Sequence, residues 1–208
     1  MSALHTIKKT VRNLELKYML RGKDHSAGRI GEMVDTVIGW ARRDEAEGVR
    51  RDKVLFDFES TFEEISDEIA QLRDRGELET YREIYGKLYR FAVEMMESSY
   101  MPLYLYILYR YANALSETGE AEEALEMFEK LREGTDRLIG IRNSYGIHCL
   151  ECCAVAAVKS GQPEKAGEAL KEMNEIAVKE FGPCSAMAMA VRRFAGRIRS
   201  EGTGRGQI

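Results

Sequence analysis

The chain contains an internal repeat with a period of 42 residues. The eight residues from Gly119, Gly-Glu-Ala-Glu-Glu-Ala-Leu-Glu, align with the eight from Gly161, Gly-Gln-Pro-Glu-Lys-Ala-Gly-Glu, and four of them are identical. The same offset relates apolar or small residues on both sides of this motif: Leu108 and Leu150, Ala112 and Ala154, Ala114 and Ala156, Phe128 and Leu170, Leu131 and Met173. A period of this length indicates one structural unit stacked on the next.

Each copy has the pattern of two helices joined by a tight turn. An apolar stretch precedes each glycine and predicts helices over 102–117 and 143–159. Gly119 and Gly161 fit the left-handed residue that commonly ends a helix. Pro163 fits the first turn of the following helix, where its missing N–H costs nothing. We therefore predict a helical hairpin in each copy.

The composition agrees with an all-helical protein. The 208 residues include only 3 prolines, while 44% of residues are apolar, so the chain can bury a core. No apolar run reaches the ~18 residues of a membrane-spanning helix. The N-terminus lacks the apolar centre of a signal peptide, so we expect a cytoplasmic protein.

These motifs resemble the tetratricopeptide repeat (TPR) superfamily. The two copies read Leu108-x2-Tyr111-Ala112-x2-Leu115, Gly119, Ala124-x3-Phe128 and Leu150-x2-Cys153-Ala154-x2-Ala157, Gly161, Ala166-x3-Leu170. The 42-residue spacing exceeds the 34 residues of a common TPR unit. Together with the Phe-Gly-Pro-Cys-Ser-Ala junction at 181–186, it is similar to the kinesin-light-chain-like branch. The resemblance implies a right-handed α-solenoid of helical hairpins.

The repeat signal divides the chain into segments of different regularity. Tyr81 stands where the small Ala124 is expected, so the unit before the two clear copies is degenerate, although its Gly76 matches Gly119. We expect an N-terminal hairpin over 1–50 and repeats over 51–200, with a flexible tail over 201–208. The repeats comprise the degenerate unit 54–98, the copies 102–140 and 141–182, and a capping helix over 184–200.

The N-terminal segment has an apolar seam. Its first helix carries apolar residues spaced three and four apart, and the helix over 27–47 continues the pattern: Leu4, Ile7, Val11, Leu14, Tyr18, then Ile30, Val34, Val37 and Ala41. We predict an antiparallel hairpin packed on the first repeat. A dimerising coiled coil stays open as the alternative, and with it a homodimer through these helices. Nothing in the turn indicates a DNA-reading helix-turn-helix.

Charge is distributed unevenly. The net charge is −4, yet residues 1–53 and 192–208 each carry about +4, leaving the middle acidic. Such ends can dock on an acidic partner or on another copy, although a solvated helix surface has the same composition. The sequence pI of about 5.6 argues against nucleic acid as the main ligand.

Eight of the 10 tyrosines lie between residues 81 and 111. By the TPR resemblance, the first helix of each repeat lines a concave groove, which would be faced by Tyr106, Tyr109 and Asn113, then by His148, Glu151, Val155 and Lys159. Such a surface suits a peptide or helix. Alternatively, the tyrosines pack on the N-terminal hairpin. Clamping of a chaperone's C-terminal carboxylate is disfavoured, because Tyr109 and Glu151 occupy positions where basic residues would help.

The sequence gives little support for a metal site or for catalysis. Cys149 and Cys152 form a CxxC beside His148, and a zinc site with Cys184 is conceivable, but buried packing cysteines explain the run better. The nucleotide, zinc-protease and hydrolase motifs are missing. We therefore predict a non-enzymatic interaction scaffold or adaptor with a protein or peptide partner and no cofactor. A peptide-sensing regulator is the alternative, followed by a Cys/His metal protein.

Overall fold

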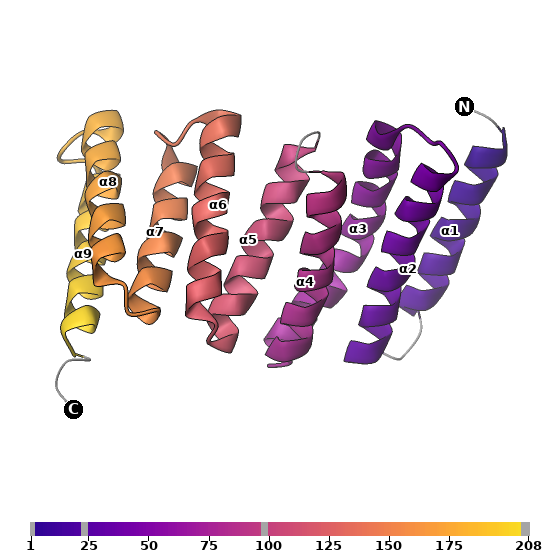
Figure 1. Cartoon of the computed structure of the whole chain (residues 1–208), viewed down its shortest axis with the longest axis horizontal. Coiled ribbons are helices and arrows are strands. Elements are labelled where there is room, and N and C mark those ends of the chain that lie inside the picture. Colours follow the sequence, from indigo (N-terminus) through magenta and orange to yellow (C-terminus); the bar gives the residue numbers. More distant parts are fainter. Residues whose placement is uncertain (1–2, 22–24, 97–99, 205–208) are drawn as a thin grey trace. The chain divides into compact units, whose positions relative to one another are not determined.

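The computed structural model describes residues 3–21, 25–96 and 100–204, and the statements below concern these residues. They form nine α-helices and no strand (Figure 1). None of these helices has the length and apolar character needed to cross a bilayer. The helices are α1 (Ala3–Arg21), α2 (Ala27–Ala46), α3 (Arg51–Asp74), α4 (Leu78–Met95), α5 (Met101–Thr118), α6 (Ala121–Ile139), α7 (Ser144–Lys159), α8 (Pro163–Phe181) and α9 (Ala186–Gly204).

Contacts divide the chain into two compact units, residues 1–104 and 105–208, with the boundary inside α5. In the first unit α3 packs on α2 and α4, and α2 also touches α4. In the second unit each of α6, α7 and α8 packs on the next helix, and α7 also touches α9. The sequence-based division after residue 50 separates the expected N-terminal hairpin from the repeats. It is a different boundary from the one that the contacts give.

The predicted helices agree with the structure to within a few residues. Gly119 and Gly161 have φ values of +95° and +74°, which places both in the left-handed region as predicted. Gly140 and Gly182, which follow α6 and α8, are also 42 residues apart and have positive φ. The repeat therefore extends to the junctions between hairpins. Helix α9 continues to Gly204, and residues 205–208 lie outside the described residues, so the tail over 201–208 stays a prediction.

Small residues let helices of the second unit approach closely. Ala124 and Ala166 are buried, as the repeat pattern predicts. A Cβ added at Gly134 of α6 would lie 2.5 Å from Cδ2 of Leu105. A Cβ at Gly146 of α7 would lie only 1.8 Å from the carbonyl oxygen of Ile141. The end of the Leu105 side chain can move aside, whereas the Ile141 backbone cannot, so packing requires glycine at position 146.

The degenerate unit, α3 and α4, solves its packing with aromatic residues. Tyr81, which replaces the expected small residue, is fully buried. Its ring meets the ring of Tyr85 edge-on, with 4.8 Å between centroids. The rings of Phe58 of α3 and Phe91 of α4 also meet, tilted, with 4.6 Å between centroids. Large aromatic side chains thus fill the space between the helices of this unit.

The N-terminal hairpin forms, but part of its apolar seam, on α1, faces solvent. Lys8 of α1 pairs with Glu47 and Arg12 with Asp44, so the partner numbers fall as the chain advances along α1, and the two helices are antiparallel as predicted. The second half of the seam, on α2, is buried. Val11, Leu14 and Tyr18 of α1 are instead exposed, and Leu16 is the buried residue. The expectation that the α1 seam packs in the hairpin is wrong for these three residues, while the side chains of Leu4 and Ile7 lie outside the described set.

Candidate functional site

The seven predicted groove residues are all accessible on α5 and α7 of the second unit. We call this surface the tyrosine–histidine face: Tyr106, Tyr109 and Asn113 on α5, and His148, Glu151, Val155 and Lys159 on α7. Residues three, four or seven apart point to one side of a helix, which explains why each set shares a face. The two sets come together because their helices are the first helices of successive hairpins.

A tyrosine–histidine pair joins the two helices. The phenol oxygen of Tyr109 lies 3.2 Å from Nε2 of His148, and the two ring centroids are 5.6 Å apart. The amide of Asn113 donates to the carbonyl oxygen of Tyr109 at 2.8 Å, within α5. Tyr109 therefore contacts α7 within the second unit.

A second bridge lies nearer the ends of the same helices. Nζ of Lys159 donates to the side-chain oxygen of Ser116 at 2.9 Å and to its carbonyl oxygen at 3.2 Å. Tyr106 is exposed, and the guanidinium of Arg110 lies 5.9 Å from the centre of its ring. The face thus offers aromatic surface, hydrogen-bonding groups and charge on a support fixed at two points.

His148 also lies beside a thiol and a carboxylate. Its Nε2 is 3.9 Å from Sγ of Cys152, and its Nδ1 is 3.5 Å from a carboxylate oxygen of Glu151. This arrangement has the residue types of a nucleophile, base and acid. Burial, together with neighbouring thiols and Glu151, raises the pKa of Cys152 to about 12. A nucleophilic cysteine needs a lowered pKa, whereas the pKa of Cys152 is raised.

The remaining cysteines behave as packing residues. Cys149 and Cys153 are buried, and burial raises the pKa of Cys153 to about 12. Sγ of Cys149 lies 3.6 Å from the hydroxyl of Thr135. Cys184 is exposed. Within the described residues, no group of three or more histidine, cysteine or acidic side chains is arranged to hold a metal ion.

The register of the face continues onto α9, which the sequence analysis treated only as a cap. At the 42-residue offset, Arg193 and Arg197 occupy the positions of Glu151 and Val155, and both side chains are exposed. Buried Val191 corresponds to buried Cys149 at the same offset. The 42-residue repeat could have predicted both arginines from the sequence. They make the α9 side of the face cationic.

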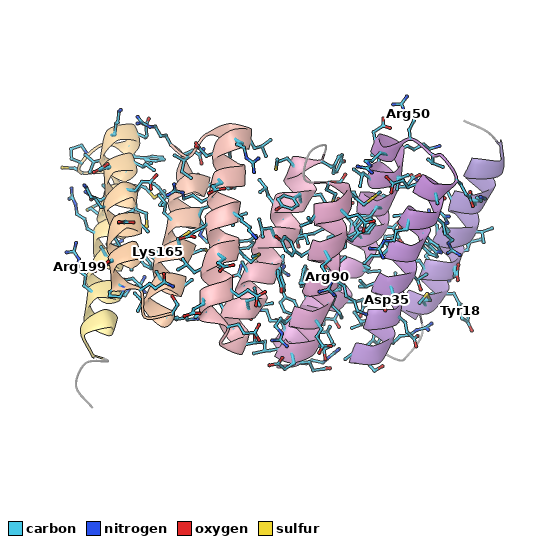
Figure 2. All side chains as sticks on the ribbon, viewed as in Figure 1. Tyr18, Asp35, Arg50, Arg90, Lys165 and Arg199 are labelled. Atoms are coloured by element: carbon cyan, nitrogen blue, oxygen red, sulfur yellow. The ribbon has the colours of Figure 1, made fainter. Side chains whose placement is uncertain are left out.

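The same register gives α9 charged residues where α7 has buried ones. Arg192 and Arg199 stand at the positions of buried Leu150 and Ala157, and both are exposed. Charged residues there leave α9 with a polar outer side, as terminal repeats require for solubility. Figure 2 shows Arg199 directed away from α8 and α9.

The hollows of the second unit lie elsewhere. An open hollow of about 860 Å³ is lined by Ile141, Arg142 and mostly charged residues of α8. None of the seven residues of the tyrosine–histidine face lines it. Small-molecule sites are concave and mostly apolar. An open helical face is better suited to an extended or helical segment of another protein.

Comparisons with known proteins identify the fold. No protein-family description and no curated protein matches the sequence. The structure is similar to a kinesin light chain from Podosopora anserina with nearly identical TPR-like repeats: TM-score 0.59 and 16% identity, over 85% of this chain and 90% of that one. A variant of that protein gives the same values. BtubC (BKLC) from P. vanneervenii has a TM-score of 0.50 and 14% identity, over 86% and 73%.

These likenesses confirm the predicted fold class. The chain is an all-α protein with a TPR-like repeat fold, an N-terminal helical hairpin and a C-terminal capping helix. At such identities the likeness concerns the fold alone. A fold of this kind is a common support for protein binding, and the role of individual residues has to be argued from the face itself.

Proposed function

We propose that the protein is a non-enzymatic scaffold or adaptor that holds a peptide or helix on the tyrosine–histidine face. One observation carries the proposal: seven accessible side chains share a register across α5 and α7, and the Tyr109–His148 and Lys159–Ser116 contacts hold the two helices together. A surface ordered before binding loses less conformational freedom when the partner arrives. Tyrosine also supplies large contact area with a polar tip, which suits interfaces.

The charges on the face indicate the chemistry of the partner. Lys159, Arg193 and Arg197 are cationic, and Glu151 is the acidic residue among the seven. We infer a partner segment with an apolar or aromatic side chain over Tyr106 and Tyr109 and acidic residues toward α9. Complementary charge would fix the direction of the segment more than its affinity. A bare chaperone-type carboxylate next to Glu151 stays disfavoured.

The second candidate function is a peptide-sensing regulator, which would use the same face. Both functions are placed in the cytoplasm, as the sequence predicts, and neither involves nucleic acid. The two differ in what the protein retains: a scaffold holds a folded macromolecule, whereas a sensor holds only a small peptide.

The test immobilises the protein and measures capture of the partner. The wild type is compared with two matched tyrosine variants. Tyr109→Ala removes the centre of the face. Tyr145→Ala removes an exposed tyrosine at the start of α7, outside the face. We expect the wild type and Tyr145→Ala to retain the same protein, and Tyr109→Ala to lose it with its helicity unchanged.

Each other outcome has a defined meaning. Equal retention by Tyr109→Ala would refute the face as the binding site. Recovery of only a small peptide would favour the regulator. An unfolded Tyr109→Ala variant would show that Tyr109 is a core residue.

A further inference from the structure

The outer side of α1 carries an apolar stripe that faces solvent. Val11, Leu14 and Tyr18 are 56%, 63% and 80% exposed, and Figure 2 shows Tyr18 directed away from the other helices. Their spacing of three and four places them on one side of α1, opposite the fully buried Leu16. Large apolar side chains gathered on one exposed side commonly mark an interaction surface.

The chain does not use this stripe to hold α1 in place. Arg12 donates to Asp44 at 2.8 Å, and Asp44 is buried. The same guanidinium lies 5.6 Å from the ring centre of Trp40, and Lys9 pairs with Asp57 of α3. Ion pairs and Leu16 thus secure one side of α1, and the apolar stripe remains available on the other.

We propose that α1 pairs in antiparallel orientation with α1 of a second copy, through this stripe. The proposal does not depend on the tyrosine–histidine face. The sequence continues the stripe in the heptad positions a (Leu4, Val11, Tyr18) and d (Ile7, Leu14). A second copy supplies the same surface, and a two-fold axis brings identical patches together. In the antiparallel pair, Val11 of each copy lies opposite Leu14 of the other.

The charged residues beside the stripe favour a second copy of α1 in antiparallel orientation. Lys8 and Glu15 both occupy the heptad position e, along one edge of the stripe. In an antiparallel pair the e positions face each other, so Lys8 of each copy meets Glu15 of the other, and two ion pairs form. In a parallel pair position e faces position g, where Ala3 lies opposite Lys8 and Thr10 opposite Glu15. The parallel arrangement therefore gains no ion pair.

The first test measures the mass of the full chain by sedimentation over a wide concentration range. The seam is short, about two and a half heptads, so we expect a monomer that becomes a dimer as concentration rises. Leu14→Glu places a charge in the centre of the stripe and should raise the dissociation constant by roughly tenfold or more. Leu138→Glu, at an exposed leucine of α6, is the control and should dimerise as the wild type does.

Two results would overturn the proposal: a wild type that stays monomeric at every concentration, or a Leu14→Glu variant that dimerises normally. Circular dichroism of each variant ensures that a lost dimer does not reflect a lost fold. Tyr109→Ala should dimerise as the wild type does, so failure of the α1 pairing and failure of the proposed function are distinguishable.

The second test establishes the direction by exchanging charges. Lys8→Glu alone and Glu15→Lys alone each place like charges opposite one another in an antiparallel homodimer, so both should dimerise more weakly. An equimolar mixture restores both opposite pairs in the mixed dimer and should recover wild-type association. Lys8 also pairs with Glu47 within the chain, so the thermal midpoint of Lys8→Glu is measured in parallel. A mixture no stronger than its components would overturn the antiparallel pairing.

Discussion

The phenol oxygen of Tyr109 in α5 lies 3.2 Å from Nε2 of His148 in α7. Both side chains remain accessible, so the contact joins the first helices of two successive hairpins on their solvent side. A contact in this position contributes little to the core, but it fixes the relative placement of two groups that a partner would meet.

We therefore expect the Tyr109–His148 contact to matter little for stability. Tyr109→Phe keeps the ring and removes the hydroxyl, and should lower the free energy of unfolding by about 1 kcal/mol or less. A double-mutant cycle with His148→Ala, measured by urea unfolding, should give a coupling of about 0.5–1 kcal/mol. A loss above about 3 kcal/mol would instead indicate a core contact, inconsistent with a binding face.

The fold was largely predictable because the 42-residue period carries packing information. Ala124 and Ala166 recur for close helix approach, and Gly119 and Gly161 recur for the left-handed turn. The orientation of α1 was not predictable in this way. Apolar periodicity shows which residues share a stripe, but it does not show which side of the helix is covered. Arg12 and Asp44, which decide that side, are far apart in sequence and have no short-range signature.

Gly146 of α7 should be difficult to replace. A Cβ there would lie 1.8 Å from the carbonyl oxygen of Ile141, and backbone cannot yield as a flexible side chain can. Asn143 fixes this region further, since its side-chain oxygen accepts from the N–H groups of Tyr145 and Gly146 at 2.8 and 3.0 Å. We expect Gly146→Ala to lower the free energy of unfolding by about 2 kcal/mol or more.

The matched control is Gly167→Ala in α8, where a Cβ has open space. Alanine has the higher helix propensity, so this variant should stabilise the protein by up to about 1 kcal/mol. Urea titration followed by circular dichroism measures both. A Gly146→Ala variant as stable as Gly167→Ala would contradict the close approach of Ile141.

The docking of α1 can be followed through the single tryptophan. Arg12 lies over the Trp40 ring and pairs with buried Asp44, so Arg12→Ala uncovers the ring and leaves a buried carboxylate without this partner. We expect a red shift of the fluorescence and a loss of about 1–3 kcal/mol in unfolding free energy. Arg50→Ala removes an exposed pair with Asp52 and should change neither. Unchanged fluorescence in Arg12→Ala would argue against this contact.

The candidate site was also predictable from the sequence only in part. The resemblance placed Tyr109, His148 and Lys159 on one face, and the structure brings them together there; their role in binding stays a prediction. Arg193 and Arg197 were missed, although the same offset reaches them, because Thr203 stands where the repeat has its turn glycine.

The Cys152 and Cys153 thiols of α7 give the protein a defined dependence on alkaline pH. Burial raises the pKa of Cys152 and of Cys153 to about 12, whereas a thiol in an unfolded chain has a pKa of about 8.5. Below that lower pKa, both the folded and the unfolded chain keep these thiols protonated, so the free energy of unfolding has its full value. Between the two values the unfolded chain releases protons that the folded chain retains. The free energy of unfolding therefore falls as pH rises through this window.

Tyrosine and lysine side chains titrate in the same range, so the measurement needs a variant in which only the thiols change. We expect urea unfolding at a series of pH values from 7 to about 10.5 to show a steeper loss of stability for the wild type than for Cys152→Ala/Cys153→Ala. Cys184→Ala, at an exposed position, should follow the wild type. Equal slopes in the wild type and the double variant would mean that these thiols are solvated enough to ionise in the folded protein, and the case against a reactive Cys152 would then fail.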